Sequence, residues 1–209
     1  MKIENLSDAL FTELDGLFLV SSTRGIIEQH LAVKKYSIPT QFFTDERFGV
    51  KLGCFVSLKE NNAEKSLRGC IGFPEPVYEL RKALPEAAIS AATRDPRFPP
   101  VEVNEMENLL LEISILTKPV ELDAPSKKDL PKMIEIGRDG LILKWSFGSG
   151  LLLPQVAPEF GWNAEDFLCN LSLKAGAPPD QWLVPGTQIF RFGAQVFLEN
   201  SPQGTVSMS

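Results

Sequence analysis

Apolar side chains recur at every second position in three well-separated segments of this chain. The segments cover residues 50–58, 109–116 and 190–198. This period of two is typical of a strand with one buried face, whereas a helix repeats about every 3.6 residues. Asn61 marks a turn after the first segment, and residues 67–72 follow where a hairpin partner is expected. The chain is therefore predicted to build sheets from neighbouring strands.

Helical spacing occupies other parts of the sequence. An N-terminal helix is predicted over about residues 7–35, because apolar side chains recur there at helical spacing. Residues 78–93 predict a second helix, which contains Pro85. Asn163 can cap a third helix that stops at Gly176. Helices and strands are thus expected to share the fold.

The second half of the chain contains the turn signals of a meander. Residues 134–137 and 141–145 have the pattern of two strands joined by a hairpin turn at 138–140. Glycines at 148–150 supply a further reversal before the apolar residues 151–153. These glycines lack the spacing of a phosphate-binding loop, so the segment is interpreted as a turn.

A polar, proline-containing stretch at residues 119–128 indicates a boundary within the chain. It separates a provisional lobe at 45–118 from a provisional lobe at 119–199, and the N-terminal helix is expected to pack on them. The last residues, 201–209, are polar and are predicted to form a disordered tail.

Composition favours a soluble protein of the cytoplasm. The 209 residues are 44% hydrophobic, which is enough for one substantial core or two small lobes. The three cysteines lack CxxC spacing and are odd in number, so a reducing compartment is expected. No apolar run reaches the roughly 18 residues of a membrane span, and no secretion signal precedes the first helix. We therefore expect no membrane partner.

Charge and histidine content exclude several classes of function. The net charge of −6, from 21 basic and 27 acidic residues, works against a nonspecific nucleic-acid surface. His30 is the single histidine, so Cys2His2 zinc sites lack ligands and a Cys-His dyad has one possible partner. No metal site is predicted, carboxylate sites for magnesium are left open, and the sequence identifies no cofactor.

The most distinctive segment, residues 67–72, combines a basic side chain, a thiol and two glycines. In an extended strand residues two apart share a face, so Arg68 is expected beside Cys70, with its cation about 7 Å from the sulfur. Gly69 and Gly72 would let another backbone or a ligand approach closely. These residues are the first candidates for a site, with Cys70 and Arg68 as candidate catalytic groups.

Cys70 also has a structural interpretation. An isolated cysteine is usually a small buried hydrophobe, and Cys54 is expected to be one. Leu67 and Ile71 are expected to turn into the core on the other face of the strand. A chemical role for Cys70 requires its thiol pKa, about 8.5 in reference peptides, to be lowered by Arg68.

Three prolines exclude a helix at residues 94–100 and predict a surface loop of fixed shape. Within it Arg94, Asp95 and Arg97 could clamp an anionic ligand, or Asp95 could simply neutralise an arginine. Glu112, on the strand at 109–116, faces either a site or water. Gln155 and Glu112 are weaker candidates for binding.

The hexapeptide Leu67-Arg68-Gly69-Cys70-Ile71-Gly72 resembles the signature of the AMMECR family, uncharacterised proteins of archaea, bacteria and eukaryotes. The resemblance extends over roughly residues 14 to 192. Further similar segments follow in the same order: Arg94-Asp95-Pro96-Arg97-Phe98-Pro99-Pro100, Leu111 to Pro119, Ile136 to Leu143, Leu151-Leu152-Leu153-Pro154-Gln155, Trp162, and Lys174-Ala175-Gly176.

The resemblance implies an α+β fold in which two lobes of mainly antiparallel sheet pack with helices and enclose a cleft. The signature is expected beside that cleft, and residues 1–200 are expected to form one domain of this type. The family has no established activity. Its genomic association with Memo-type and radical-SAM proteins implies a modification pathway and candidate partners.

Two hypotheses of function follow, and whether the protein is an enzyme is left open. In the first, Cys70 is a nucleophile or a substrate-holding thiol of an enzyme in a modification pathway. In the second, Arg68, Arg94 and Arg97 hold a small molecule, a peptide or a modified nucleotide without chemistry, because arginine forks suit carboxylates and phosphates. A scaffold subunit for partner enzymes is a further alternative.

Overall fold

The computed structural model describes residues 11–208 and divides into two compact units. The larger unit contains residues 11–116 and 195–208, and the smaller unit contains residues 117–194. The chain passes from one unit to the other after residues 116 and 194, whereas the provisional lobes span residues 45–118 and 119–199. No helix among residues 11–208 is both long enough and apolar enough to cross a membrane.

A five-stranded sheet forms the centre of the larger unit, in the order β2-β1-β3-β8-β9. The β1–β2, β1–β3 and β8–β9 pairs are antiparallel, so the hairpin predicted after Asn61 is confirmed. Strand β2 lies at one edge and β9 at the other. The strands are β1 (Gly53–Glu60), β2 (Leu67–Phe73), β3 (Leu109–Leu116), β8 (Ala194–Glu199) and β9 (Val206–Met208).

Local sequence determines where the helices of this unit begin and end. Thr12 and Asp15 form a reciprocal capping box at the start of α1 (Glu13–Val33), and Lys34 ends it in the left-handed conformation. The predicted helix is thus confirmed from residue 13, and its part before residue 11 lies outside the described residues. The remaining helices are α2 (Gln41–Thr44), α3 (Leu80–Thr93) and the 3-10 turns η1 (Glu46–Gly49) and η2 (Val103–Asn108).

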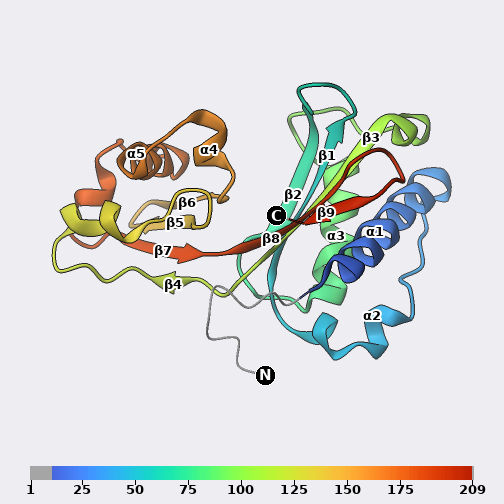
Figure 1. Cartoon of the computed structure of the whole chain (residues 1–209), viewed down its shortest axis with the longest axis horizontal. Coiled ribbons are helices and arrows are strands. Elements are labelled where there is room, and N and C mark those ends of the chain that lie inside the picture. The colour runs from blue at the N-terminus through green and yellow to red at the C-terminus, as the bar shows by residue number, and fades with distance from the viewer. Residues whose placement is uncertain (1–10, 209) are drawn as a thin grey trace. The chain divides into compact units, whose positions relative to one another are not determined.

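Helices α1 and α3 pack on the sheet of this unit (Figure 1). Their apolar faces join the alternate residues of β1 and β3 in one buried cluster, and Cys54 belongs to it as predicted. Burying a large apolar side chain contributes about 1.5–3 kcal/mol. This cluster therefore fixes the register of the strands that carry the candidate site.

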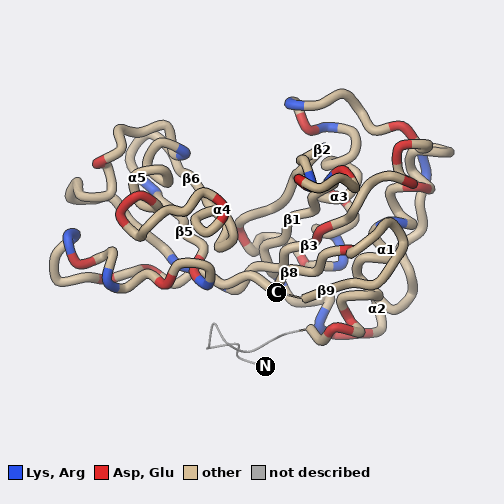
Figure 2. Tube along the Cα trace, turned by 45° about the horizontal axis from the view of Figure 1, so that its top comes forward, with Lys and Arg blue, Asp and Glu red and all other residues tan. Residues whose placement is uncertain are grey.

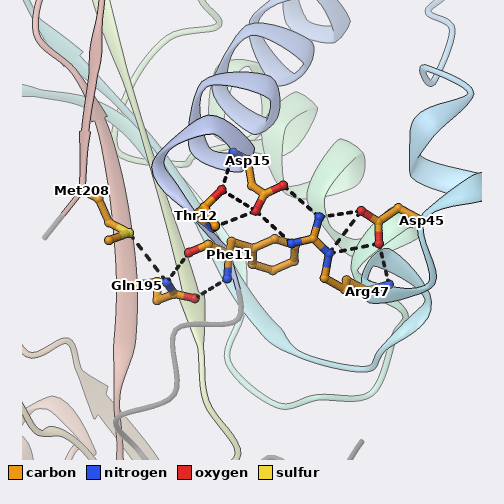
Figure 3. A network of polar contacts seen from close by, with 7 residues as sticks. All are labelled: Phe11, Thr12, Asp15, Asp45, Arg47, Gln195 and Met208. Atoms are coloured by element: carbon orange, nitrogen blue, oxygen red, sulfur yellow. Dashed lines mark hydrogen bonds and ion pairs between the residues drawn. The ribbon is translucent and has the colours of Figure 1, made fainter.

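A polar network joins the start of α1 to β8 and to the segment before β1 (Figure 3). The Arg47 guanidinium donates to both carboxylate oxygens of Asp15 at 2.8 Å and to Asp45 at 2.7 Å. The Gln195 side-chain amide accepts a hydrogen bond from the Phe11 N–H at 3.1 Å and donates one to the Phe11 carbonyl at 2.9 Å. The pKa of Asp15 lies well below its usual value because Arg47 hydrogen-bonds its charged form.

The smaller unit contains a four-stranded sheet in the order β4-β7-β5-β6. Helix α5 packs on one face of it, and Asn163 caps that helix as predicted, with Asp166 completing a capping box. The strands are β4 (Val120–Glu121), β5 (Gly140–Trp145), β6 (Gly148–Leu152) and β7 (Gln188–Phe192). The helices are α4 (Val156–Phe160), α5 (Ala164–Lys174) and the 3-10 turns η3 (Lys127–Met133) and η4 (Gln181–Leu183).

The prediction of a single long strand at residues 190–198 is wrong. These residues lie in two strands, β7 and β8, which belong to different sheets and are separated at Gly193. The Gly193 N–H donates to the Thr117 hydroxyl at 2.8 Å, and the Thr117 N–H donates to the Gly193 carbonyl at 2.9 Å. Alternation continues through the break because both strands have one buried face, so periodicity alone could not reveal it.

Two further expectations are corrected by the backbone. The hairpin of the smaller unit joins β5 to β6, and residues 134–137 form no strand, because the buried carboxylate of Asp139 accepts the Glu135 N–H and closes a turn there. The tail expected to be disordered includes strand β9, which pairs with β8. The polar composition of residues 201–209 gave no sign of this strand. It lies at the edge of the sheet and pairs with β8 alone.

Two glycines in α1 are expected to respond in opposite ways to alanine. A Cβ at Gly16 would lie 2.2 Å from the Phe197 ring, whereas a Cβ at Gly25 would meet nothing within 4 Å. Gly16→Ala should lower the free energy of unfolding by about 1–3 kcal/mol through overpacking. Gly25→Ala should raise it by about 0.5–1 kcal/mol through helix propensity. Denaturant titration of both variants tests this, and equal effects would contradict the packing of α1 on β8.

Candidate functional site

Strand β2 carries the signature segment at the edge of the larger sheet. It pairs with β1 on one side only, so the backbone groups on its other side need partners from outside the sheet. Ile71 packs against the core as expected, and so does Phe73, but Leu67 is exposed at the start of the strand. The prediction that Leu67 turns into the core is therefore wrong.

The loop after α3 supplies those partners to Cys70. The Asp95 carboxylate accepts the Cys70 N–H at 2.8 Å, and Arg97 Nη2 donates to the Cys70 carbonyl at 3.3 Å. Asp95 also accepts from Arg97 Nε at 2.9 Å and from Nη2 at 2.6 Å. One carboxylate and one guanidinium thus take the place of a neighbouring strand at this residue.

The same loop is held at a second point by Arg68. Its guanidinium donates to the Pro99 carbonyl at 2.9 Å and to both oxygens of Glu105, at 2.9 and 3.0 Å. The pKa of Glu105 lies below its usual value, chiefly because of this hydrogen bond. Arg68 therefore positions the loop and η2 through a two-pronged ion pair.

Both glycines of the signature lie where a side chain would collide with its surroundings. A Cβ at Gly69 would lie 2.3 Å from the Ala91 carbonyl of α3. A Cβ at Gly72 would lie 2.2 Å from the Cys54 carbonyl and 2.4 Å from the Phe55 ring. A close approach to these glycines was predicted, by another backbone or by a ligand. The groups that approach them belong to the protein's own helix α3 and to the neighbouring strand β1.

Across the sheet, Cys70 begins a row of polar residues. Ser57 of β1 lies opposite Cys70 on one side and opposite Glu112 of β3 on the other. The Ser57 hydroxyl lies 3.2 Å from the Cys70 sulfur, and Lys59 donates to Glu112 at 2.7 Å. Ser57 and Glu112 are buried and Cys70 is half-buried. The core cluster holds the alternate residues of these strands, so this row lies on the other face.

Electrostatics keep the Cys70 thiol protonated at neutral pH. Burial raises its pKa above the ordinary value of a cysteine, and the nearby carboxylates of Glu112 and Asp95 act in the same direction. The Ser57 hydrogen bond and the charge of Arg97 oppose this effect without reversing it. The cation that acts on the sulfur is Arg97 and not Arg68 as expected, because the Arg68 guanidinium is directed to Pro99 and Glu105 whereas Arg97 also contacts the Cys70 carbonyl.

The pKa of Asp95 is shifted in the opposite direction, because several groups hydrogen-bond to its carboxylate. The residue is only 4% exposed, and its pKa lies well below the usual value because Arg97 hydrogen-bonds its charged form. The Cys70 and Arg97 backbone N–H groups add to this effect. The Asp95 carboxylate is consequently a fixed negative charge that orients Arg97.

Two predicted site residues lie outside this arrangement. Arg94 is exposed and pairs with Glu86 on α3 at 2.5 Å. Gln155 belongs to the smaller unit, where it precedes α4, and its buried Oε1 has no hydrogen-bond partner among the described residues. The structure thus brings together Arg68, Gly69, Cys70, Asp95 and Arg97, with Glu112 two strands away.

Ser57, Lys59 and Glu105 are the members of the arrangement that the sequence analysis did not select. Ser57 and Lys59 follow from the alternation of residues 50–58, once β1 is paired with the signature strand. No nearby sequence pattern pointed to Glu105 as a site residue, because its partner Arg68 is distant in the sequence.

Charge and ligand chemistry limit what this surface can bind. Within residues 11–208, no three His, Cys, Asp or Glu side chains are grouped so that they could hold a metal ion. Acidic and basic residues are interspersed along the described trace, which has no long basic stretch (Figure 2). The arrangement instead offers one oriented guanidinium beside hydroxyl and thiol groups.

The architecture defines an α+β protein with two mainly antiparallel sheets, and sequence comparison defines its family. A family model described as AMMECR1 matches residues 20–197. Protein MJ0810 of Methanocaldococcus jannaschii is 50% identical over 197 residues, which are 94% of this chain and 96% of that protein. Protein PYRAB00100 of Pyrococcus abyssi is 47% identical over 193 residues, 91% of this chain and 93% of that protein. The chain belongs to the AMMECR1 family, which confirms the resemblance seen in the sequence.

A solved structure has the same fold. The crystal structure of uncharacterized protein PH0010 from Pyrococcus horikoshii matches with a TM-score of 0.90 and 43% sequence identity. The match covers 96% of this chain and 99% of that one. The α+β fold is thereby confirmed, whereas the names of these relatives assign no activity. The cleft implied between the lobes stays a prediction.

Removal of the Asp95 charge should loosen the loop from β2. We expect Asp95→Asn to lower the free energy of unfolding at pH 7 by about 2–3 kcal/mol, because charged hydrogen bonds to Arg97 and Cys70 are lost. The lowered pKa of Asp95 means that its contribution is present at neutral pH and is lost as the carboxylate becomes protonated in acid.

Denaturant titration at pH 7 and at pH 3 measures this effect. The difference between wild type and variant should shrink at the lower pH. Asp129→Asn is the matched control, because the Asp129–Lys132 pair is exposed and should contribute little to stability. Equal stability of wild type and Asp95→Asn at pH 7 would contradict the assignment.

Proposed function

We propose that the signature strand and its loop form a binding surface for a small polar anion, and that Cys70 takes part as a neutral thiol. Arg97 is the residue on which this proposal depends. Its side chain is 53% exposed although Asp95 and the Cys70 carbonyl hold two of its nitrogens. No described residue accepts a hydrogen bond from its Nη1 group, which remains available for a ligand.

The fixed orientation of Arg97 supports anion binding. A flexible arginine loses side-chain entropy when it binds, but this guanidinium is already held by Asp95 and lies over the Phe98 ring, 5.4 Å from its centroid. The Asp95 charge offsets part of the attraction for an anion. Recognition therefore depends on hydrogen-bond geometry as well as on charge, as expected for a carboxylate or phosphate group.

The sulfur and hydroxyl beside Arg97 complete the surface that we propose. The buried Ser57 hydroxyl donates to the Cys70 sulfur, so the half-buried Cys70 thiol keeps its own hydrogen for a ligand. Such neutral donors accompany a guanidinium without repelling an anion. The ligand class is a small or modified polar molecule that carries a carboxylate or phosphate.

An enzyme that uses Cys70 as a thiolate nucleophile is the alternative, and the electrostatics of the site disfavour it. A thiol whose pKa is raised above its ordinary value is almost entirely protonated at pH 7, so a general base would be needed. Glu112 lies in the same row but is two strands away and engaged with Lys59. The scaffold role implied by the family stays a prediction.

Small molecules that co-purify with the native protein should identify the ligand. We expect mass spectrometry of heat-released extracts to find an anionic compound with wild type that is at least tenfold depleted with Arg97→Gln. Arg94→Gln is the matched control, because Arg94 pairs with Glu86 away from Cys70, and it should retain the compound. Equal retention by Arg97→Gln would contradict the proposal.

Alkylation of Cys70 distinguishes binding from thiolate chemistry. In a Cys54→Ser, Cys169→Ser background, the iodoacetamide labelling rate should rise only above about pH 9, since the thiol pKa is raised. Cys70→Ser should keep binding of the co-purified compound within about threefold, because the hydroxyl also donates a hydrogen bond. A labelling midpoint below pH 7.5 would instead support a nucleophile.

A further inference from the structure

A separate cavity of about 290 Å³ lies in the larger unit between α1 and the β8–β9 hairpin. Leu17 and Val20 of α1 and Val206 of β9 provide apolar walls. Gln203 and Gly204, in the turn before β9, also line the cavity. The cavity shares no lining residue with the signature strand or its loop, so the proposed function does not explain it.

Gly25 indicates that this space is kept open. Glycine is among the least favourable residues in a helix interior, and Gly16 of the same helix is explained by the ring of Phe197. Gly25 has no such explanation, because a Cβ there would meet no atom within 4 Å. It lines the cavity, so any larger side chain at this position would reduce the space.

Charged groups from both α1 and β8 also line the cavity. Arg24 is 4% exposed and Glu199 is 2% exposed, and the two form a two-pronged ion pair. Arg24 also donates to the Met106 carbonyl at 2.9 Å and the Leu109 carbonyl at 2.6 Å. Its hydrogen-bonding capacity is therefore largely used within the protein.

A second carboxylate gives the cavity a negative balance. Glu28 lies 3.5 Å from Arg24 Nη1, is only half-buried and also lines the cavity. Two carboxylates therefore face one guanidinium, and no other charged residue lines the cavity. Apolar walls beside a net negative charge suit a cation carried on an aliphatic stem.

We propose that this cavity binds an ammonium or guanidinium group on a short aliphatic stem. The cation pairs with Glu28, and the stem packs along Leu17, Val20 and the face left open by Gly25. A free aliphatic amine and the lysine or arginine side chain of a peptide share this chemistry.

NMR titration of the ¹⁵N-labelled protein tests the site with defined probes. The probes are n-butylammonium chloride for the free amine, Nα-acetyl-lysine N-methylamide for the peptide side chain, and 1-butanol as the neutral isostere, all at constant ionic strength. Saturable shifts are expected for at least one cation at the amides of Ser21, Gly25, Glu28 and Gly204. Saturation by butylammonium alone assigns the cavity to a free amine, and saturation by the lysine amide assigns it to a peptide side chain.

Two variants make the test specific. Gly25→Leu should fill the cavity and abolish saturable binding, while its dispersed spectrum reports that the fold is retained. Glu28→Gln keeps the shape and should weaken binding at least fivefold, whereas Glu107→Gln, at a residue that does not line the cavity, should change it by less than twofold. The proposal is overturned if neither cation saturates, if 1-butanol binds equally well, or if Glu28→Gln and Glu107→Gln have the same effect.

Discussion

The outer edge of strand β2 is the constraint on which the candidate site depends. An edge strand leaves backbone groups without sheet partners, and unpaired groups of this kind invite pairing with other chains. At Cys70 the Asp95 carboxylate and the Arg97 guanidinium satisfy these groups. The proline-rich loop therefore has a definite structural task, which is to cover this edge while presenting an arginine to solvent.

This arrangement accounts for the composition of the signature segment. Gly69 admits the backbone of α3 and Gly72 admits the Phe55 ring, so the strand lies closer to its neighbours than side chains would permit. Arg68 anchors the loop through Pro99 and Glu105. Cys70 remains as the residue that faces Ser57 with a protonated thiol, and Arg97 as the cation beside it.

The sequence predicted most of the elements and part of the site. Alternation located β1 and β3, and Asn163 located the start of α5, because each signal is local. Gly193 divides one alternating run between two sheets, and β9 is polar, so neither could be read from periodicity. The pairing of Arg68 with Glu105 and the seating of Asp95 on Cys70 depend on how distant segments meet. Residue types thus indicated the site, but only the fold shows which cation lies beside the sulfur.

Hydrogen exchange at the Cys70 amide tests the central claim most directly. By strand alternation the Gly72 amide points to the same outer edge, so the two amides differ mainly in the Asp95 carboxylate. The account predicts that the Cys70 amide exchanges at least tenfold more slowly than the Gly72 amide, and that Asp95→Asn removes most of this difference. Equal exchange of the two amides in the wild-type protein would contradict it.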